Sequence, residues 1–490
     1  MRRAALATLL FLSGCDSGGG GTPTPTPTPA PPNAAPSFTS AAAAAVAENS
    51  AVATTIYQAT ATDPNGDPLT FSIAGGDDAA RFAITAAGAL TFVAKPDFEL
   101  PGDANRDNVY LVQLRVSDAS LSATLNLQVT VTNDREGIRL RRLTTGLNDP
   151  VFVSGEARTN NIYVAERGGK IYRLSYITGE RTLVHTASNI TTAGNGGVLA
   201  IADNFSKIDI NFNHPYYLAS ASNGDLEVRS FTAGSDAYQI WMTIPHPANG
   251  QYHSTLAFAG GFPIYLVTDD GGVPANAQDP FSLLGKVLRL GDCRVTGPGS
   301  QRFCGPGDGV THNPYVVAMG LHAPGLTWED GPRNLYITDS GPTWQEINVM
   351  PTTVVGSATV PNFGWPYFEG AAAGTGTPPA GFTHATPALQ YSPPLGSAIF
   401  PSVLYRLPEI AALGGKTLFG DRSSGNIWSV PTASLLTGAP VPTTSFEQRN
   451  ADFVPDVGTV DHPVGIFQDF PGYLFLIDAD GEVYMIEPAV

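Results

Sequence analysis

Short runs of apolar and aromatic residues recur from Gly137 to the end of the chain, at intervals of roughly 50 to 80 residues. Each repeat joins one alternating strand, through a polar turn, to a second. The six strand pairs span Asn161–Leu174, Pro215–Arg229, Pro263–Arg289, Asn334–Ile347, Thr417–Trp428 and Tyr473–Tyr484. Such sheet units cannot bury their faces alone. The pattern therefore predicts an all-β, six-bladed β-propeller over residues 135–490, whose last blade the strand near Ile138–Leu143 completes.

A second alternating pattern occupies residues 36–134. Its candidate strands are Phe71–Ile73, Arg81–Ile84, Ala89–Val93, Val109–Val116 and Leu125–Val131. Clusters of Gly, Pro and Asp separate them at the spacing of a small β-sandwich. We therefore predict this sandwich before the propeller.

The first 35 residues follow neither pattern. Residues 1–15 combine two arginines, a short apolar run and Leu12-Ser13-Gly14-Cys15. The run is too short to span a bilayer, which favours a cleaved export signal. Residues 16–35 are rich in Gly and in Thr-Pro repeats, which predicts an extended, semi-stiff linker.

The end of the first segment resembles the lipobox of bacterial lipoproteins, in which the cysteine is lipidated. This resemblance implies a lipid anchor at Cys15, which would hold the chain on the periplasmic or cell-surface side of a bacterial membrane. The alternative is an ordinary signal peptide with a chance cysteine. The remaining cysteines, Cys293 and Cys304, flank a loop with Gly and Pro. In an oxidising compartment we expect them to form a disulfide.

Composition and charge narrow the partners. Fifty-three Gly and 41 Pro, with only 14% charged residues, favour short strands and tight turns. The net charge of −17 repels phosphate backbones, so nucleic acid is not expected as a partner. The excess carboxylates either form a solvated surface or bind metal ions.

In the predicted sandwich the acidic residues gather at the ends of the strands. Calcium takes six to eight oxygen ligands, usually carboxylates and carbonyls of loops. The candidate ligands are Glu48, Asp63, Asn65, Asp67, Asp97, Glu99, Asp118 and Asp134. Alternatively, these side chains satisfy backbone groups in turns.

The acidic set resembles that of a cadherin repeat. The resemblance rests on Glu48, the Asp-rich loop after Thr62, Asp97-x-Glu99, Val116-Ser117-Asp118 and Thr132-Asn133-Asp134. It implies a calcium-binding module, although the exit linker is shortened and no second repeat follows.

The predicted propeller carries an ordered set of phrases. They are Gly146–Pro150, Tyr163–Ile171, Gly197–Ala202, Thr268–Gly272, Asn276–Asp279, Leu284–Arg289, Asn313-Pro314, Gly320–Pro324, Ser340–Pro342, Glu346–Asn348 and Asn362–Pro366. In this order they resemble the glucose/sorbosone dehydrogenase family of propellers that use pyrroloquinoline quinone (PQQ). The resemblance covers about 350 residues. It implies a sugar dehydrogenase that oxidises an aldose with PQQ and calcium.

Such chemistry needs a base for a sugar hydroxyl proton, cations for a tricarboxylate quinone, and calcium to polarise it. The family uses as base the histidine of a His-x-Gly-Gly phrase, which Gln251–Phe258 replaces here. The base position falls on Gln251, and His253 follows two residues later. Since alternate residues of a strand share a face, we predict His253 as the base. The alternative is a packing or surface histidine.

Other positions of the resemblance suggest cofactor contacts. His322 and Ala323 replace the Arg-Asn of the family's Gly-Leu-Arg-Asn-Pro, and an imidazole binds a carboxylate less well than a guanidinium. The predicted cofactor residues are Asn195, Gln251, Gln278, His322 and Arg422. Arg422 could equally be an ordinary surface arginine. The carbonyls of Gly341 and Pro342 match the family's calcium-side phrase, or belong to a tight turn.

These departures leave two functions open. One is a PQQ-dependent, calcium-requiring sugar dehydrogenase. The other is a calcium-dependent adhesion or carbohydrate-binding surface lipoprotein with a non-catalytic propeller and homophilic or cell-surface contacts.

Overall fold

The computed structural model describes residues 31–203, 214–258, 263–292, 303–306, 309–328, 334–354, 360–469 and 472–489. Cys15, the predicted lipidation site, and Cys293, one half of the predicted disulfide, lie outside these residues. Within them, no helix is both long enough and apolar enough to cross a bilayer.

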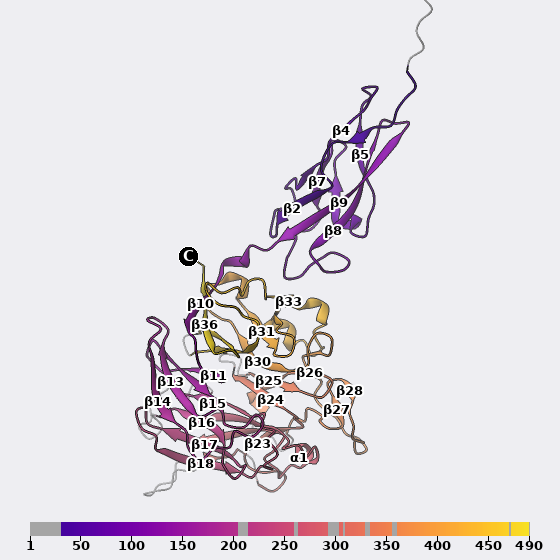
Figure 1. Cartoon of the computed structure of the whole chain (residues 1–490). Helices are drawn as coiled ribbons and strands as arrows, with labels where there is room; N and C mark the ends of the chain where they lie inside the picture. The colour runs from indigo at the N-terminus through magenta and orange to yellow at the C-terminus, as the bar shows by residue number, and fades with distance from the viewer. Residues whose placement is uncertain are drawn as a thin grey trace, which may run out of the picture. The chain divides into compact units, whose positions relative to one another are not determined.

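The strands of the predicted sandwich form three sheets (Figure 1). The four-stranded sheet has the order β2 (Ala43–Ala47), β9 (Ser122–Thr132), β8 (Val109–Ser117) and β5 (Thr70–Gly75). The smaller sheets are β3 (Tyr57–Gln58) with β7 (Ala89–Phe92) and β6 (Phe82–Ile84), and β1 (Ser37–Phe38) with β4 (Ala61–Thr62). In β8 the alternate residues Tyr110, Val112, Leu114 and Val116 are buried. This alternation is typical of a sheet that packs one face on a core.

Seven further sheets follow in the described part of the chain, of which six are propeller blades (Figure 1). The seventh is a two-stranded sheet of β27 (Phe368–Glu369) and β28 (Ala372–Ala373). The innermost strands are β11 (Pro150–Gly155), β15 (Val198–Ala202), β19 (Thr255–Phe258), β24 (Pro324–Trp328), β30 (Ile399–Leu404) and β34 (Pro463–Gln468). The second strands are β12 (Asn161–Glu166), β16 (Tyr216–Ser220), β20 (Ile264–Thr268), β25 (Asn334–Ser340), β31 (Lys416–Asp421) and β35 (Leu474–Asp478). The third strands are β13 (Lys170–Ser175), β17 (Leu226–Phe231), β21 (Lys286–Asp292), β26 (Gln345–Pro351), β32 (Ile427–Pro431) and β36 (Glu482–Pro488). The outermost strands are β14 (Arg181–Thr186), β18 (Tyr238–Ile244), β23 (Val316–Met319), β29 (Leu389–Tyr391), β33 (Glu447–Gln448) and β10 (Ile138–Thr144).

The innermost strands close a ring, since each contacts the next in order and β34 contacts β11. The last blade combines both ends of the propeller, because β10 pairs antiparallel with β36, with Leu140 opposite Ile486. The expectations of a six-bladed propeller, and of an early strand that completes its last blade, are therefore confirmed.

Burial in the blades explains why their strands are so apolar. In β16, β20 and β35 every residue is buried, because neighbouring blades cover both faces of each sheet. Tight turns join the strands. At Gly169, between β12 and β13, φ is 107° and a β-carbon would lie 2.9 Å from the carbonyl oxygen of Ala187, so this turn requires glycine. The only α-helix among the described residues, α1 (Ala275–Gln278), lies between β20 and β21.

Candidate active site in the axial well

A cavity lies on the axis of the ring, because all six innermost strands line it. They contribute Phe152, Leu199, Thr255, Gly325, Pro401 and Phe467, among others. Its empty volume is about 820 Å³, which includes the solvent space at its open end. We call it the axial well. Its polar lining includes Arg167, Asn195, His253, Ser254 and Arg422.

One hydrogen-bond arrangement recurs at the mouth of the well in every blade. A polar side chain at the end of the second strand accepts a backbone N–H from the residues just before the innermost strand. The pairs are Glu166 with Asn148, Ser220 with Gly197, Asp269 with His253, Asp339 with His322 and Ala323, Asp421 with Ala398, and Asp478 with Asp461 and His462. We call these side chains the strand-end caps. They fix the loops that surround the well.

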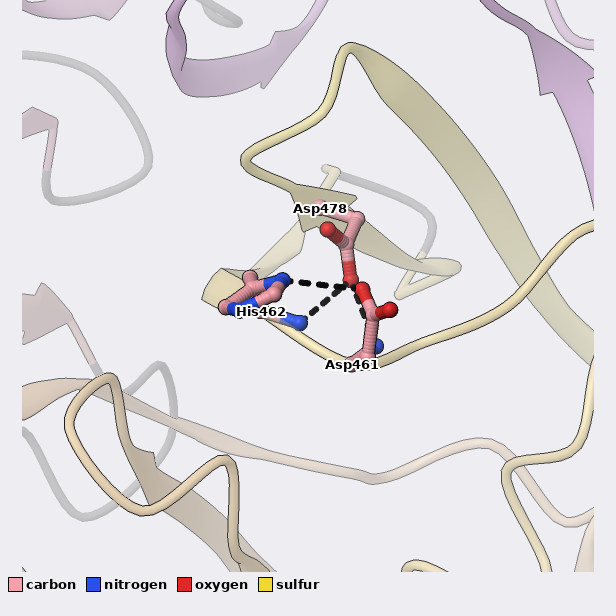
Figure 2. A group of neighbouring side chains, drawn as sticks. All are labelled: Asp461, His462 and Asp478. Atoms are coloured by element: carbon pink, nitrogen blue, oxygen red, sulfur yellow. Dashed lines mark hydrogen bonds and ion pairs between the residues drawn. The ribbon is translucent and has the colours of Figure 1, made fainter.

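The cap of the last blade belongs to a group with metal-ligand geometry. Ligand atoms of Asp461, His462 and Asp478 lie within 4.8 Å of one another, and Figure 2 shows the three side chains facing one another. However, one oxygen of Asp478 accepts both backbone N–H groups at 3.0 Å, and His462 Nδ1 lies 3.0 Å from Asp461. The other blades hold their loops in the same way. The group is therefore explained as a strand-end cap.

His253 lies in the loop before β19, not in a strand as the two-residue spacing argument assumed, since β19 begins at Thr255. It nevertheless lines the well, because Asp269 accepts its backbone N–H at 2.8 Å and the Ser254 hydroxyl at 3.0 Å. The amide nitrogen of Asn195 lies 3.0 Å from Nε2 of the ring.

The surroundings of His253 favour its neutral form. Although the side chain of His253 is exposed to the well, desolvation by the surrounding walls lowers the pKa of its ring, and the charge of Arg422 lowers it further, against the opposing charge of Asp269. A neutral imidazole can accept a proton, which is the property that a general base needs.

Two guanidinium groups give the well a positive region. Nε of Arg422 donates to the carbonyl of Val464 at 2.9 Å, and its two Nη groups have no acceptor among the described residues. Arg167 bonds Asp149 at 2.7 Å and the carbonyl of Asn195 at 2.7 Å. Burial and the charge of Arg167 lower the pKa of Arg422 to about 10, so it stays charged at neutral pH.

The structure does not bring three of the predicted cofactor residues into the lining of the well. The amide of Gln278 bonds that of Asn362 and donates to the carbonyl of Trp365, and Gln251 is exposed in its loop. His322 lies against Trp365, with ring centroids 4.4 Å apart, and its Nδ1 lies 3.1 Å from Asp270.

The predicted calcium side of the cofactor site forms a turn. The carbonyl of Gly341 accepts the side-chain amide of Gln345 at 3.0 Å, and its N–H donates to Trp344. Pro342 is exposed. Neither residue lines the well, whereas Ser340, just before them, does.

The candidate calcium ligands of the sandwich mostly bind backbone groups. Asp63 accepts from Asn65 and Asp67, Asp97 from Leu100, Asp118 from Ser120 and Leu121, and Asp134 from Glu136. Glu48 accepts the N–H groups of Phe98 and Asp134. Ligand atoms of Glu48, Glu99 and Glu136 lie within 4.8 Å of one another, and burial raises the pKa of Glu99 to about 9.

Sequence reasoning missed Arg167 and the role of Asp269. Aligning the repeats at their strand-end caps would have found both. Arg167 directly follows the cap Glu166, as Arg422 follows Asp421, and Ser340 follows Asp339 at the same position. All three line the well.

Solved structures share this propeller. The PQQ-bound aldose sugar dehydrogenase of Streptomyces coelicolor is 20% identical, with a TM-score of 0.53 over 71% of this chain and 98% of that one. The apo-form of the soluble aldose sugar dehydrogenase of Escherichia coli is 16% identical, with a TM-score of 0.53 over 72% of this chain and 99% of that one. An oxidoreductase of Thermus thermophilus, described as a glucose dehydrogenase, is 18% identical, with a TM-score of 0.51 over 71% of this chain and 100% of that one. At these identities the likeness shows the fold.

The family follows from the sequence. The family model for glucose/sorbosone dehydrogenase matches residues 148–432, which is more than half of the chain and includes His253, Arg167 and Arg422. With the propeller and its well, this match shows that the chain belongs to the glucose/sorbosone dehydrogenase family.

Proposed function

We propose that the chain is a PQQ-dependent dehydrogenase that oxidises an aldose in the axial well. One observation carries the proposal: a neutral histidine and an arginine with unused Nη groups line the same cavity. The donors present fit a quinone that bears carboxylates. Arg422 offers a fork of N–H groups, which binds a carboxylate well, and Arg167 adds a second positive charge.

In the proposed mechanism, PQQ when bound supplies the acceptor for the hydride that leaves the sugar carbon. The chain's own residues manage the proton. The unprotonated ring nitrogen of neutral His253 accepts the proton of the sugar hydroxyl. In the free protein the Asn195 amide donates to this nitrogen, Nε2, at 3.0 Å, and the sugar hydroxyl takes the place of that amide. Asp269 fixes the loop of His253 from behind. Arg422 would hold a carboxylate of the cofactor through its Nη groups.

The proposal extends to location, and it limits the role of calcium. Residues 1–15 support export and a lipid anchor at Cys15, with residues 16–35 as a spacer.

The family resemblance also implies calcium in the well. Because Gly341 and Pro342 form a turn outside the lining, we assign calcium no step here.

The test uses purified protein freed of cofactor. PQQ is titrated in with calcium present, and the reduction of an artificial electron acceptor is followed with a panel of aldoses. We expect His253→Asn to lower turnover by about a hundredfold or more and to leave PQQ binding in place, since a general base contributes that much. His462→Asn is the control, because this ring is exposed outside the well. Absence of PQQ binding, with no sugar oxidised, contradicts the proposal.

A further inference from the structure

A second histidine lies behind the loop that carries His253. The side chain of His246 is fully buried between β18 and β19, and it does not line the well. Its Nδ1 lies 2.7 Å from the carbonyl oxygen of Pro247, and its Nε2 lies 2.8 Å from Oδ1 of Asp269. Its ring stacks on Tyr252, with centroids 4.6 Å apart.

Both contacts of the His246 ring require it to donate. A carbonyl oxygen and an ionised carboxylate only accept hydrogen bonds, and a neutral imidazole has a single N–H. Only the doubly protonated ring can satisfy both partners. A proton on Asp269 instead is disfavoured, because Asp269 also accepts from the N–H of Gly271 and of His253 and from the hydroxyl of Ser254.

His185 provides a matched comparison within the same propeller. It is also buried, and its Nδ1 lies 2.8 Å from a carbonyl oxygen, that of Ser235. Its Nε2, however, lies 3.3 Å from the hydroxyl of Tyr217, which can donate. A neutral ring satisfies both of these partners. The chemical nature of the second partner therefore separates the two histidines.

We propose that His246 is a buried imidazolium that acts as a positioning residue for the loop of His253, through Asp269. The functional part of this inference rests on the proposed dehydrogenase activity. The charged and titratable groups that face His246 are Asp269 after β20, Asp225 between β16 and β17, and the stacked Tyr252. The imidazolium balances the charge of Asp269, so the carboxylate can hold two backbone N–H groups and a hydroxyl in a buried place.

The first test needs neither cofactor nor substrate. Wild-type protein labelled with ¹⁵N-histidine is observed by NMR at pH 7, and the variants His246→Gln and His185→Gln assign the two buried rings. We expect two protonated ring nitrogens for His246 and one for His185. A single protonated nitrogen on His246 overturns the proposal. If one of these variants unfolds, His246→Asn or His185→Asn assigns the same ring.

The second test follows the pKa of His253 by the same spectra. In His246→Gln the charge of Asp269 loses its partner, so the pKa of His253 should rise. In Asp269→Asn the same pKa should fall, because Asp269 raises it in the native protein. Opposite shifts would not follow from loosened packing alone. An unchanged pKa in both variants overturns the proposal.

These tests separate the two proposals. Two protonated nitrogens on His246, in a protein that neither binds PQQ nor oxidises sugars, would remove the dehydrogenase and keep the imidazolium. A fall in turnover with an unchanged KM in His246→Gln, where the pKa of His253 shifts as expected, supports both. His185→Gln is the control and should leave turnover and the pKa of His253 unaltered.

Discussion

At the scale of single residues, Arg422 determines how tightly the axial well binds an anion. Its Nε is fixed by the carbonyl of Val464, so the Nη groups are held ready for a ligand. We expect Arg422→Gln to weaken PQQ binding about tenfold to a hundredfold, the value of a hydrogen bond to a charged group. A fluorescence or absorbance titration of the cofactor-free protein measures this. Lys170→Gln, which removes an exposed charge from β13, should bind PQQ as the native protein does.

The pKa of His253 sets the acid limit of turnover. The base must be unprotonated, and desolvation and Arg422 lower its pKa below the ordinary 6.5. Activity should therefore persist below pH 6.5 and fall only as His253 becomes protonated. In Arg422→Gln the acid limb should move to higher pH, because a charge that lowers the pKa is gone. A profile of kcat against pH measures both, and an acid limb above 6.5 in the native protein would contradict the assignment.

At the scale of elements, the strand-end caps bind the loops that surround the opening of the axial well. Asp478 is fully buried, and one of its oxygens accepts two backbone N–H groups. Asp478→Ala leaves these two backbone N–H groups without their charged acceptor, which should lower the free energy of unfolding by about 1.5 to 3 kcal/mol. Urea unfolding measures the loss. Asp461→Ala, which leaves the cap in place, should cost far less. Equal losses, or stabilisation by added calcium of the native protein but not of Asp478→Ala, would argue against the cap.

The sequence predicted the blades better than the loops of the site. Strands buried on both faces, such as β20 and β35, leave a strong apolar pattern, and turns separate them. The position of His253 depends on Asp269, sixteen residues away across a blade, and no local pattern encodes that contact. The place of Gln278 outside the lining of the well has a similar cause, since Asn362 holds it from another blade. The repeated caps were visible in the sequence, but only alignment of the blades reveals them.

At the scale of the whole molecule, the pairing of β10 with β36 joins the first and last strands of the propeller. Leu140 is fully buried there and packs in a cluster with Phe400, Tyr405 and Ile466. Leu140→Ala should cost about 2 to 5 kcal/mol of unfolding free energy. Because the ring closes on itself, the loss should appear as one cooperative transition by circular dichroism and by tryptophan fluorescence. Arg139→Ala, on the partly exposed side of β10, is the control.

The same pairing sets an order on biosynthesis. Arg141 of β10 and Glu487 of β36 are hydrogen-bonded although 346 positions separate them in the chain. A ribosome therefore releases the opening strand long before its partner exists. Until β36 has been synthesised, β10 has no strand to pair with, and an unpaired strand edge can pair with a wrong strand. A nascent chain that lacks β36 leaves β10 without its partner strand, and the last blade stays incomplete.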